Sequence, residues 1–296
     1  MSWLKAEIQV HRDHVPPLES LLLSQGAVSI TLTDLEDEPI LEPDVGETPL
    51  WPEVEVSALF EPSTPRDTLA AVLSLAPGVD PVNGIRYTEV ENRDWERDRI
   101  QQLKPMCFGE RLWVAPGETS VDDAAATVVR LDPGLAFGTG THPTTRLCLE
   151  WLSARDVAGC KVLDYGSGSG ILGIAAACLG AERVLCVDRD PQAVQATREN
   201  AERNSVADRL VAQDTDADFE FKADILLANI LAGPLVVLAP MLAEAVRPGG
   251  RVALSGILPG QAEEVAQAYA PWFGPMRVRE QSLWVLLTAT RKDPGL

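Results

Sequence analysis

The sequence predicts an α/β protein in which an open, Rossmann-like sheet follows a smaller α+β domain. The first observation is an apolar run at 161–164, followed by a glycine-rich segment at 165–170 and a helix-like apolar pattern from Ile171. This succession predicts a buried strand, a tight turn and the start of a helix. The second observation is that apolar runs of strand length alternate with helical patterns beyond this point, as in an open sheet covered by helices.

Composition sets limits on the class of protein. With 296 residues, of which 46% are hydrophobic, the chain can build one large core or two ordinary ones. No apolar stretch is long and uncharged enough to span a bilayer, and the first residues lack the pattern of a signal peptide. The five cysteines are scattered, odd in number and mostly inside apolar runs. They indicate small core residues in a reducing compartment, so we expect a cytoplasmic protein that uses neither metal nor membrane.

The formal net charge of −19 bears on the choice of partner. It argues against non-specific binding to nucleic acid phosphate. It suits a basic partner through long-range attraction, although solubility alone is a sufficient reason for an acidic surface.

The region before residue 93 predicts a small domain of its own. Its patterns follow the order β-α-β-β-α-β, which is typical of a split βαβ or ferredoxin-like unit. The expected elements are a strand at 3–10, a helix at 16–23, strands at 27–35 and 54–60, a helix capped by Thr64 and ended at Pro77-Gly78, and a strand at 84–91. No residue in this region has a catalytic pattern.

Two polar stretches complete the domain organisation. Acids and prolines at 36–52 predict a long exposed loop. The segment 94–105 has sparse apolar spacing and predicts a short helix between domains. The expected boundaries are therefore 1–93 for the smaller domain, 94–105 for the linker and 106–296 for the larger domain.

The glycine-rich turn predicts a nucleoside-binding site. Glycine permits a sharp bend and a close approach by a ligand, and the helix that follows offers free N–H groups. The next strand, at 183–187, ends in Asp188, and an acidic residue in that place can bind both hydroxyls of a ribose. Because Gly168, Gly170 and Gly173 also satisfy the dinucleotide pattern GxGxxG, a dehydrogenase is an alternative at this point.

A second candidate lies further along the chain. The apolar strand that begins at Ala223 carries a lone polar Asn229 at its carboxyl end, the edge where ligands bind in an open α/β sheet. Because Asp164 falls on the same edge, we favour a substrate contact for Asn229 over a buried structural amide. The strand expected at 209–212 is followed by 213–216, which could include an adenine contact.

The end of the chain predicts an antiparallel finish to the sheet. A tight turn is expected at 247–250, followed by a strand at 251–255 and a helix at 261–269. The last two strands, 276–280 and 282–290, are separated by a single residue. Parallel strands need a crossover of about a dozen residues or more, so the final strand must run antiparallel beside its predecessor.

The loop at 132–145 is rich in glycine and threonine, which is typical of segments that carry binding groups. Thr145 falls near the first turn of the following helix, where its hydroxyl could cap the helix or face a ligand. His142 has neither a nearby cysteine nor an acid pair, which favours a structural or lid role over a metal site or a catalytic triad.

These features resemble the class I S-adenosylmethionine-dependent methyltransferases, whose seven-stranded sheet has an antiparallel last strand. The closer resemblance is to the bacterial methyltransferases of ribosomal protein L-eleven (L11). Three runs carry it: DPGLAFGTGTHPTT at 132–145, LDYGSGSG at 163–170 and ANILAGP at 228–234. Two departures are visible: Ser167 stands where cysteine is common in that family, and the acidic loop at 36–52 does not align with the family pattern.

The resemblance implies a function. Members of that family trimethylate lysine side chains and the N-terminal amine of L11, and their N-terminal domain binds this substrate. It implies S-adenosylmethionine as the cofactor and Thr145, Gly166, Gly168, Asp188 and Asn229 as cofactor-binding residues. It further implies a monomer that acts on L11 free or before ribosome assembly, without direct contact to nucleic acid or membrane.

The expected mechanism is an in-line displacement, in which the protein's main task is positioning and desolvation. We expect Asn229 and the carbonyls after it to orient the amine, and Phe137 and the threonine-rich loop to close over the cofactor. Alternatives are a methyltransferase acting on another protein, a nucleic acid or a small molecule, a cofactor-binding assembly factor without catalysis, and an NAD-dependent dehydrogenase.

Overall fold

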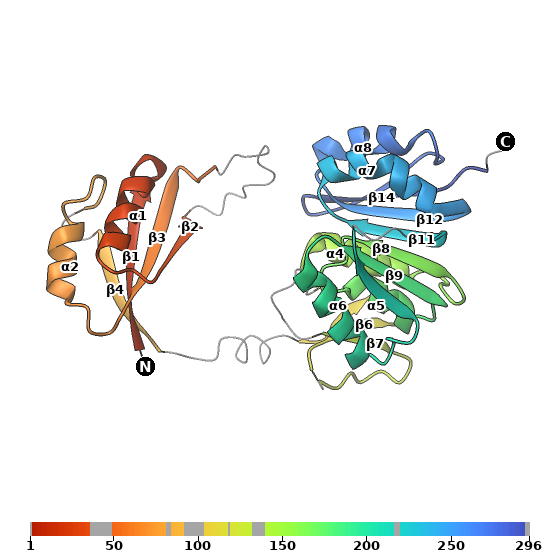
Figure 1. The fold of residues 1–296 in the computed structure, drawn as a ribbon, viewed down its shortest axis with the longest axis horizontal. Coiled ribbons are helices and arrows are strands. Elements are labelled where there is room, and N and C mark those ends of the chain that lie inside the picture. Colours follow the sequence, from red (N-terminus) through yellow and green to blue (C-terminus); the bar gives the residue numbers. More distant parts are fainter. Residues whose placement is uncertain are drawn as a thin grey trace. The chain divides into compact units, whose positions relative to one another are not determined.

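The computed structural model describes residues 2–35, 49–80, 84–91, 104–117, 119–131, 140–215 and 220–293. The chain forms two compact units, Met1–Asp94 and Trp95–Leu296, and each has hydrophobic clusters of its own (Figure 1). The expected connecting helix at 94–105 falls almost entirely on residues outside the described ranges, as does most of the expected loop at 36–52.

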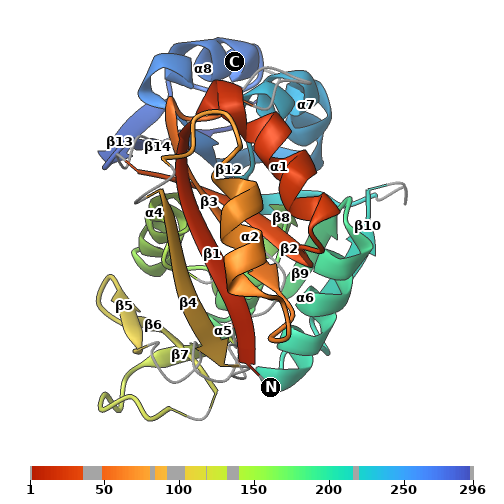
Figure 2. The same cartoon turned by 90° about the vertical axis from the view of Figure 1, so that its left-hand side faces the viewer.

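The N-terminal unit is a four-stranded antiparallel sheet with two helices on one face, as Figure 2 shows. In the strand order β2-β3-β1-β4, the first strand lies between β3 and β4. Alternate residues of β1 and β3 are buried against the helices and form the core of this unit. In chain order the elements are β1 (Ser2–His11), η1 (Arg12–His14), α1 (Val15–Ser24), β2 (Ser29–Asp34), β3 (Glu53–Phe60), α2 (Arg66–Leu73) and β4 (Ile85–Glu91).

The expected cap of α2 is wrong. The helix begins at Arg66, its N-cap is Pro65 in an extended conformation, and no side chain caps it. Thr64 instead lies in the preceding turn, where its backbone N–H donates to the carbonyl of Glu61 at 3.0 Å. Proline at position 65 fixes the extended backbone that starts the helix, so the threonine falls one residue too early to cap it.

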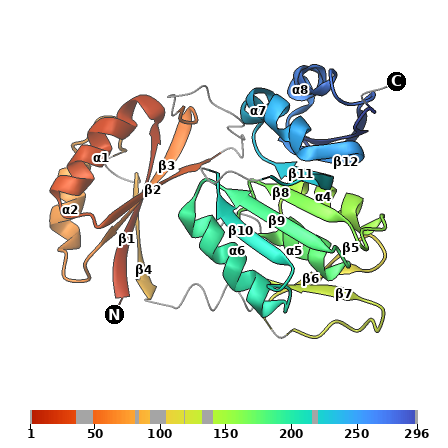
Figure 3. The same cartoon turned by 45° about the vertical axis from the view of Figure 1, so that its right-hand side comes forward.

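The C-terminal unit has a seven-stranded sheet between two layers of helices, best followed in Figure 3. Its strand order is β10-β9-β8-β11-β12-β14-β13, and every neighbouring pair is parallel except those that β14 makes. The strands are β8 (Lys161–Tyr165), β9 (Arg183–Asp188), β10 (Leu210–Asp214), β11 (Ala223–Asn229), β12 (Val246–Ile257), β13 (Arg277–Gln281) and β14 (Trp284–Thr290).

One face of this sheet packs against three helices and the other against two. The first hydrophobic cluster includes residues of α4 (Pro143–Ser153), α5 (Ile171–Cys178) and α6 (Pro191–Arg203). The second includes residues of α7 (Ala232–Ala245) and α8 (Ala262–Tyr269), the latter preceded by the short η2 (Pro259–Gln261). A three-stranded sheet of β5 (Met106–Phe108), β6 (Leu112–Ala115) and β7 (Thr127–Arg130) adds Phe108 and Leu112 to the first cluster.

The expected antiparallel finish is present. β13 and β14 form a hairpin in which Gln281 pairs with Trp284, and β14 lies between β12 and β13. The two residues of the hairpin loop include Ser282, whose φ of 56° is the left-handed conformation that such loops require. The sequence placed the last strand's start two residues too early, at 282 instead of Trp284.

Two further expectations are corrected. The tight turn expected at 247–250 belongs to β12, which begins at Val246, where it pairs with Ala223 across a register shift. The backbones of Gly249 and Gly250 both bond to Arg291, so the two glycines form an irregular strand edge and not a free turn. The strand expected at 209–212 extends to Asp214.

Candidate functional site

The candidate residues gather at the carboxyl ends of three neighbouring strands, β8, β9 and β11. In the sheet, β8 lies between β9 and β11, so the chain winds outward in one direction through β9 and in the other through β11. Asp164 of β8 pairs with Leu227 of β11, which places Asn229 just past the end of β8. Such a topological switch point opens a crevice in which α/β sheets bind ligands.

Glycine is required in the turn between β8 and α5. Gly166, Gly168 and Gly170 have φ values of 75°, 56° and 80°, a region that other residues rarely adopt. A Cβ on Gly166 would lie 2.2 Å from Cγ2 of Ile230, which follows Asn229. The turn therefore passes too close to the end of β11 for any side chain at this position.

Asp188 ties this turn to the end of β9. One carboxylate oxygen accepts the N–H of Gly168 at 2.8 Å and the other accepts the N–H of Asp190 at 3.0 Å. A carboxylate offers about four acceptor positions, so two remain for hydroxyl groups of a ligand. The glycine turn and the acidic residue expected to serve one nucleoside site are thus in direct contact.

Asp164 is a site residue that sequence reasoning used only to mark the sheet edge. Its side chain is buried, Oδ2 accepts the N–H of Gly173 at 2.8 Å, and Oδ1 has no partner among the described residues. Burial raises the pKa of this carboxyl to about 7; the bond from Gly173 opposes that rise and the charge of Asp188 adds to it. A buried oxygen without a partner is unusual and suits a ligand that donates a hydrogen bond.

Asn229 and Thr145 meet at the same edge. The Asn229 amide nitrogen donates to the Thr145 hydroxyl at 3.3 Å, which links β11 to the first turn of α4. Thr145 is only 1% exposed. The sequence left open whether Thr145 caps α4 or faces a ligand. The cap of α4 is His142, so Thr145 does not have the first role.

His142 has the structural role that the sequence favoured. Its Nδ1 lies 2.7 Å from the Thr144 hydroxyl and accepts the N–H of Thr144 at 3.4 Å. Its ring packs edge-on against Trp284, with centroids 5.0 Å apart. Burial lowers the pKa of His142, which favours the neutral ring, the form that can accept at Nδ1.

Two side chains of α6 donate hydrogen bonds to the glycine turn, and neither belongs to a recognisable sequence motif. Thr197 donates to the carbonyl of Gly168 at 3.1 Å, and Asn200 donates to the carbonyl of Ser169 at 2.9 Å. Both are buried polar residues on a helix whose other buried positions are mostly apolar. A polar residue at a buried helical position was the available signal.

The remaining expectations divide as follows. Asp214 pairs in register with Asp188, so the end of β10 reaches the same edge, while Asp216 lies outside the described residues. Phe137 and the rest of 132–139 also lie outside them. The described ranges contain no group of His, Cys, Asp or Glu that could hold a metal, and none of their helices is long and apolar enough to cross a membrane.

All five cysteines are free, and Cys148 and Cys186 are buried in the core as expected. The other three are partly exposed; of these, Cys160 and Cys178 pack against a hydrophobic core cluster and Cys107 does not.

The sheet is open and mostly parallel, with a glycine turn and an acidic residue at its switch point. These features are typical of enzymes that bind a cofactor containing a nucleoside. Comparison with known proteins narrows this class. The family model for ribosomal protein L11 methyltransferase (PrmA) matches residues 2–292. The chain therefore belongs to the ribosomal protein L11 methyltransferase family.

Relatives and a solved structure agree with that assignment. The chain is 48% identical over 297 residues to a ribosomal protein L11 methyltransferase of Marinobacter nauticus, covering 99% of this chain and 100% of that one. It is 48% identical over 294 residues to one of Pseudomonas savastanoi pv. phaseolicola, with the same coverage. A crystal structure of a ribosomal protein L11 methylase from Lactobacillus delbrueckii subsp. bulgaricus is 34% identical, has a TM-score of 0.60 and matches 64% of this chain and 100% of that chain.

Proposed function

We propose that the chain transfers methyl groups from S-adenosylmethionine to lysine side chains and the N-terminal amine of ribosomal protein L11, up to trimethylation. Family membership supports the methyltransferase activity and the substrate protein. The observation that carries the assignment of residues is the meeting of Asn229, Thr145 and the glycine turn at one edge of the sheet. The fold class follows with it: a class I methyltransferase sheet joined to an N-terminal ferredoxin-like unit, which the strand order β2-β3-β1-β4 supports.

The described residues fit the cofactor. Asp188 has acceptor positions left for ribose hydroxyls, and the backbone of Gly168 can be approached by a ligand without a Cβ in the way. The unpartnered, buried oxygen of Asp164 offers an acceptor for a charged amino group. We assign Thr145, Gly166, Gly168, Asp188 and Asn229 to cofactor binding and add Asp164 to them.

The bound cofactor supplies a sulfonium methyl group that is already activated, so the protein's contribution is geometry. The Asn229 amide nitrogen is engaged by Thr145, and among the described residues its carbonyl oxygen has no hydrogen-bond partner. That oxygen is an acceptor suited to an N–H of the substrate amine. Held in this way, the amine would keep its lone pair free for the methyl group that the bound cofactor would supply.

The amine must be neutral to attack, whereas a free lysine has a pKa of roughly 10.4. A dry crevice beside a positive charge favours loss of that proton. The described site offers no histidine base, since His142 is engaged as the cap of α4. We assign the proton to water, and Asn229 acts by orientation alone.

In this proposal the two units have different functions. The larger unit binds the cofactor, and the N-terminal unit recognises L11, with the connecting segment between them. The net charge of −19 suits a lysine-bearing partner by long-range attraction. A cytoplasmic, monomeric enzyme without direct nucleic acid contact remains part of the proposal, and the free cysteines support a reducing compartment.

The test is mass spectrometry of purified L11 incubated with this protein and S-adenosylmethionine. We expect mass gains in steps of one methyl group, mapped by fragmentation to lysines and the N-terminal amine. Cofactor binding without any gain in mass would point to another substrate or to an assembly factor. Binding of NAD in place of S-adenosylmethionine would overturn the proposal.

A further inference from the structure

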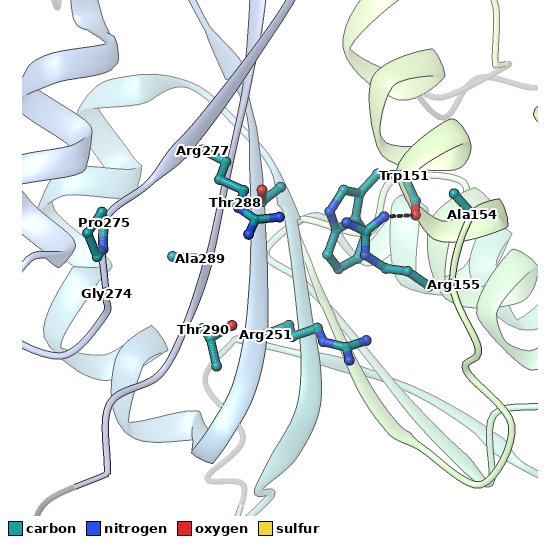
Figure 4. Close-up of a pocket in the computed structure, with 10 residues that line it drawn as sticks. All are labelled: Trp151, Ala154, Arg155, Arg251, Gly274, Pro275, Arg277, Thr288, Ala289 and Thr290. Atoms are coloured by element: carbon teal, nitrogen blue, oxygen red, sulfur yellow. Dashed lines mark hydrogen bonds between the residues drawn. The ribbon is translucent and has the colours of Figure 1, made fainter. Parts of the chain in front are cut away.

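A pocket lies in the C-terminal unit, near the amino ends of the parallel strands and away from the carboxyl ends where Asn229 lies. Arg251 lines it from the first half of β12 and pairs with Thr290 of β14, whereas Asn229 pairs with Ser255 further along the same strand. The pocket has a volume of about 660 Å³. Its walls come from α4 and the two residues after it, the turn before β13, and the strands β12, β13 and β14 (Figure 4).

Three arginines converge on this pocket. Arg155, Arg251 and Arg277 all line it, and Figure 4 shows them reaching it from different elements. Among the described residues, Arg251 and Arg277 make no ion pair, and Arg155 donates only to the carbonyl of Trp151, at 2.5 Å. Burial, together with the like charges of Arg251 and Arg277, lowers the pKa of Arg155 to about 10.

Asp156, next to Arg155 in the chain, and Asp224, on the strand beside β12, bond to other groups. Asp156 accepts the N–H of Ala158 at 3.1 Å, and Asp224 accepts the N–H of Lys161 at 2.6 Å and pairs with Arg247. No acidic group contributes to the pKa shift of Arg155. The chain as a whole has a net charge of −19, so a cluster of three cations without a carboxylate is unusual in it. A need for solubility does not explain such a cluster.

Trp151 supplies an independent observation. Its side chain is stacked under Arg155, with the guanidinium carbon 3.9 Å from the ring centroid, and the residue is only 6% exposed. The indole Nε1 is buried and has no hydrogen-bond partner among the described residues. In Figure 4 the nitrogen-bearing side of the ring faces Arg277 and Thr288. A buried N–H without an acceptor is costly unless a ligand provides one.

We propose that this pocket binds a small phosphorylated ligand through its phosphate oxygens. Guanidinium groups and an indole N–H are donors only, so the complementary ligand is rich in acceptors and negatively charged. Arginine matches phosphate by paired, charge-assisted hydrogen bonds. The volume is in the range of small-molecule sites. The net charge of −19 disfavours a nucleic acid strand, so we commit to a free phosphate compound. The proposal concerns residues outside the methyl-transfer site and does not depend on it.

The test is isothermal titration of the full-length protein with inorganic pyrophosphate, with uridine diphosphate and with a short uridine oligonucleotide. Saturating S-adenosylhomocysteine is kept present so that the nucleoside site is filled. We expect one binding event per chain for pyrophosphate and for the diphosphate. Arg251→Gln and Arg277→Gln should each weaken this binding about tenfold or more, since each removes charge-assisted bonds.

Arg183→Gln is the matched control. Arg183 is exposed, begins β9 at the amino edge of the same sheet, and makes no ion pair among the described residues. The Arg183→Gln substitution changes the net charge by the same amount at a position outside the pocket. This variant should therefore bind pyrophosphate with the affinity of the wild type. Trp151→Phe keeps the stacked ring, removes the N–H and should weaken binding a few-fold.

Each outcome decides the matter, provided thermal unfolding shows that the variants fold. No binding of pyrophosphate or diphosphate at millimolar concentration would overturn the proposal. Equal losses in Arg183→Gln and Arg277→Gln would also overturn it, because only net charge would then matter. Binding of the oligonucleotide alone, lost in Arg277→Gln, would replace the small ligand with a nucleic acid strand.

Discussion

The side-chain amide of Asn229 donates to the hydroxyl of Thr145 across 84 positions of sequence, at 3.3 Å. This bond joins the end of a central strand to the first turn of the helix that covers it. It fixes which end of the amide faces the crevice, because the nitrogen is held and the oxygen is left for the ligand. Thr145 therefore orients Asn229, which in our proposal orients the substrate amine.

Replacing Asn229 by alanine should lower kcat for L11 methylation by roughly 10²-fold, the cost of losing near-attack geometry. Thr145→Val keeps the buried shape, removes the acceptor and should give a smaller loss of the same kind. Thr144→Val is the control, since this neighbouring buried threonine contacts His142 and not Asn229. Steady-state kinetics with L11 measure all three, and an unchanged kcat for Asn229→Ala would remove Asn229 from the mechanism.

Gly166→Ala should destabilise the protein and weaken cofactor binding. Its φ of 75° costs about 1–2 kcal/mol for a residue with a Cβ, and the overlap with Ile230 adds about 1–3 kcal/mol. Gly159→Ala is matched, because Gly159 has a φ of 72° with nothing near its missing Cβ. Chemical unfolding should show the larger loss at Gly166, partly recovered in the double variant with Ile230→Ala; equal losses at both glycines would contradict the close approach.

Asp188→Asn should weaken S-adenosylmethionine binding about 10- to 100-fold, the range for a hydrogen bond to a charged group. Asp190→Asn is the control in the same loop. Asp190 caps α6 by accepting the N–H of Gln192, a role that asparagine fulfils equally well. Calorimetric titration with the cofactor separates the two, and similar affinities for both variants would mean that Asp188 serves the turn alone.

Asp164 should give the free protein a characteristic pH dependence. Its folded pKa of about 7 lies above the ordinary 3.8, so the folded chain holds this proton more tightly than the unfolded chain. The stability it contributes is present at low pH and declines as the pH rises from 3.8 to about 7. Asp164→Asn lacks this decline.

The measurement is the difference in unfolding free energy between wild type and Asp164→Asn, taken by urea titration across that pH range. Groups such as Glu7, whose pKa is lowered by its hydrogen bonds to Arg86 and Lys5, contribute equally to both proteins and cancel. We expect the difference to move against the wild type as the pH rises. A constant difference would show that Asp164 is ionised throughout.

Removing residues 1–94 should separate cofactor binding from methylation of L11. The C-terminal unit has two hydrophobic clusters that share no residue with that of the N-terminal unit, so it has a core of its own. We expect the shortened protein to unfold cooperatively and bind S-adenosylmethionine with wild-type affinity, yet to leave L11 unmodified. Methylation at the full rate would place substrate recognition in the C-terminal unit.

Local patterns predicted much of this site because its elements are short and their chemistry is local. The strand and glycine turn at 161–173 and the strand that ends at Asn229 were placed within a residue or two, since burial and positive φ leave direct marks in sequence. The cap of α2 was wrong because Thr64 and Pro65 compete for one position, and the turn at 247–250 was wrong because its glycines bond to Arg291, forty residues away.

Features made by distant residues were beyond such reasoning. Thr145 had two roles open to it until the fold brought Asn229 beside it. The pocket of Arg155, Arg251 and Arg277 joins one helix end to two strands, and no spacing in the chain connects them. Support of the glycine turn by Thr197 and Asn200 depends in the same way on how α6 packs.

The insertion of β14 between β12 and β13 has a consequence for synthesis on the ribosome. Leu286 packs in one core of the C-terminal unit and Leu287 in the other, so residues 284–290 complete both. The N-terminal unit can fold as soon as it emerges, since domains fold as units during translation. The C-terminal unit must wait with an open sheet edge until its last strand is made, and during that interval a nascent chain depends on protection from aggregation.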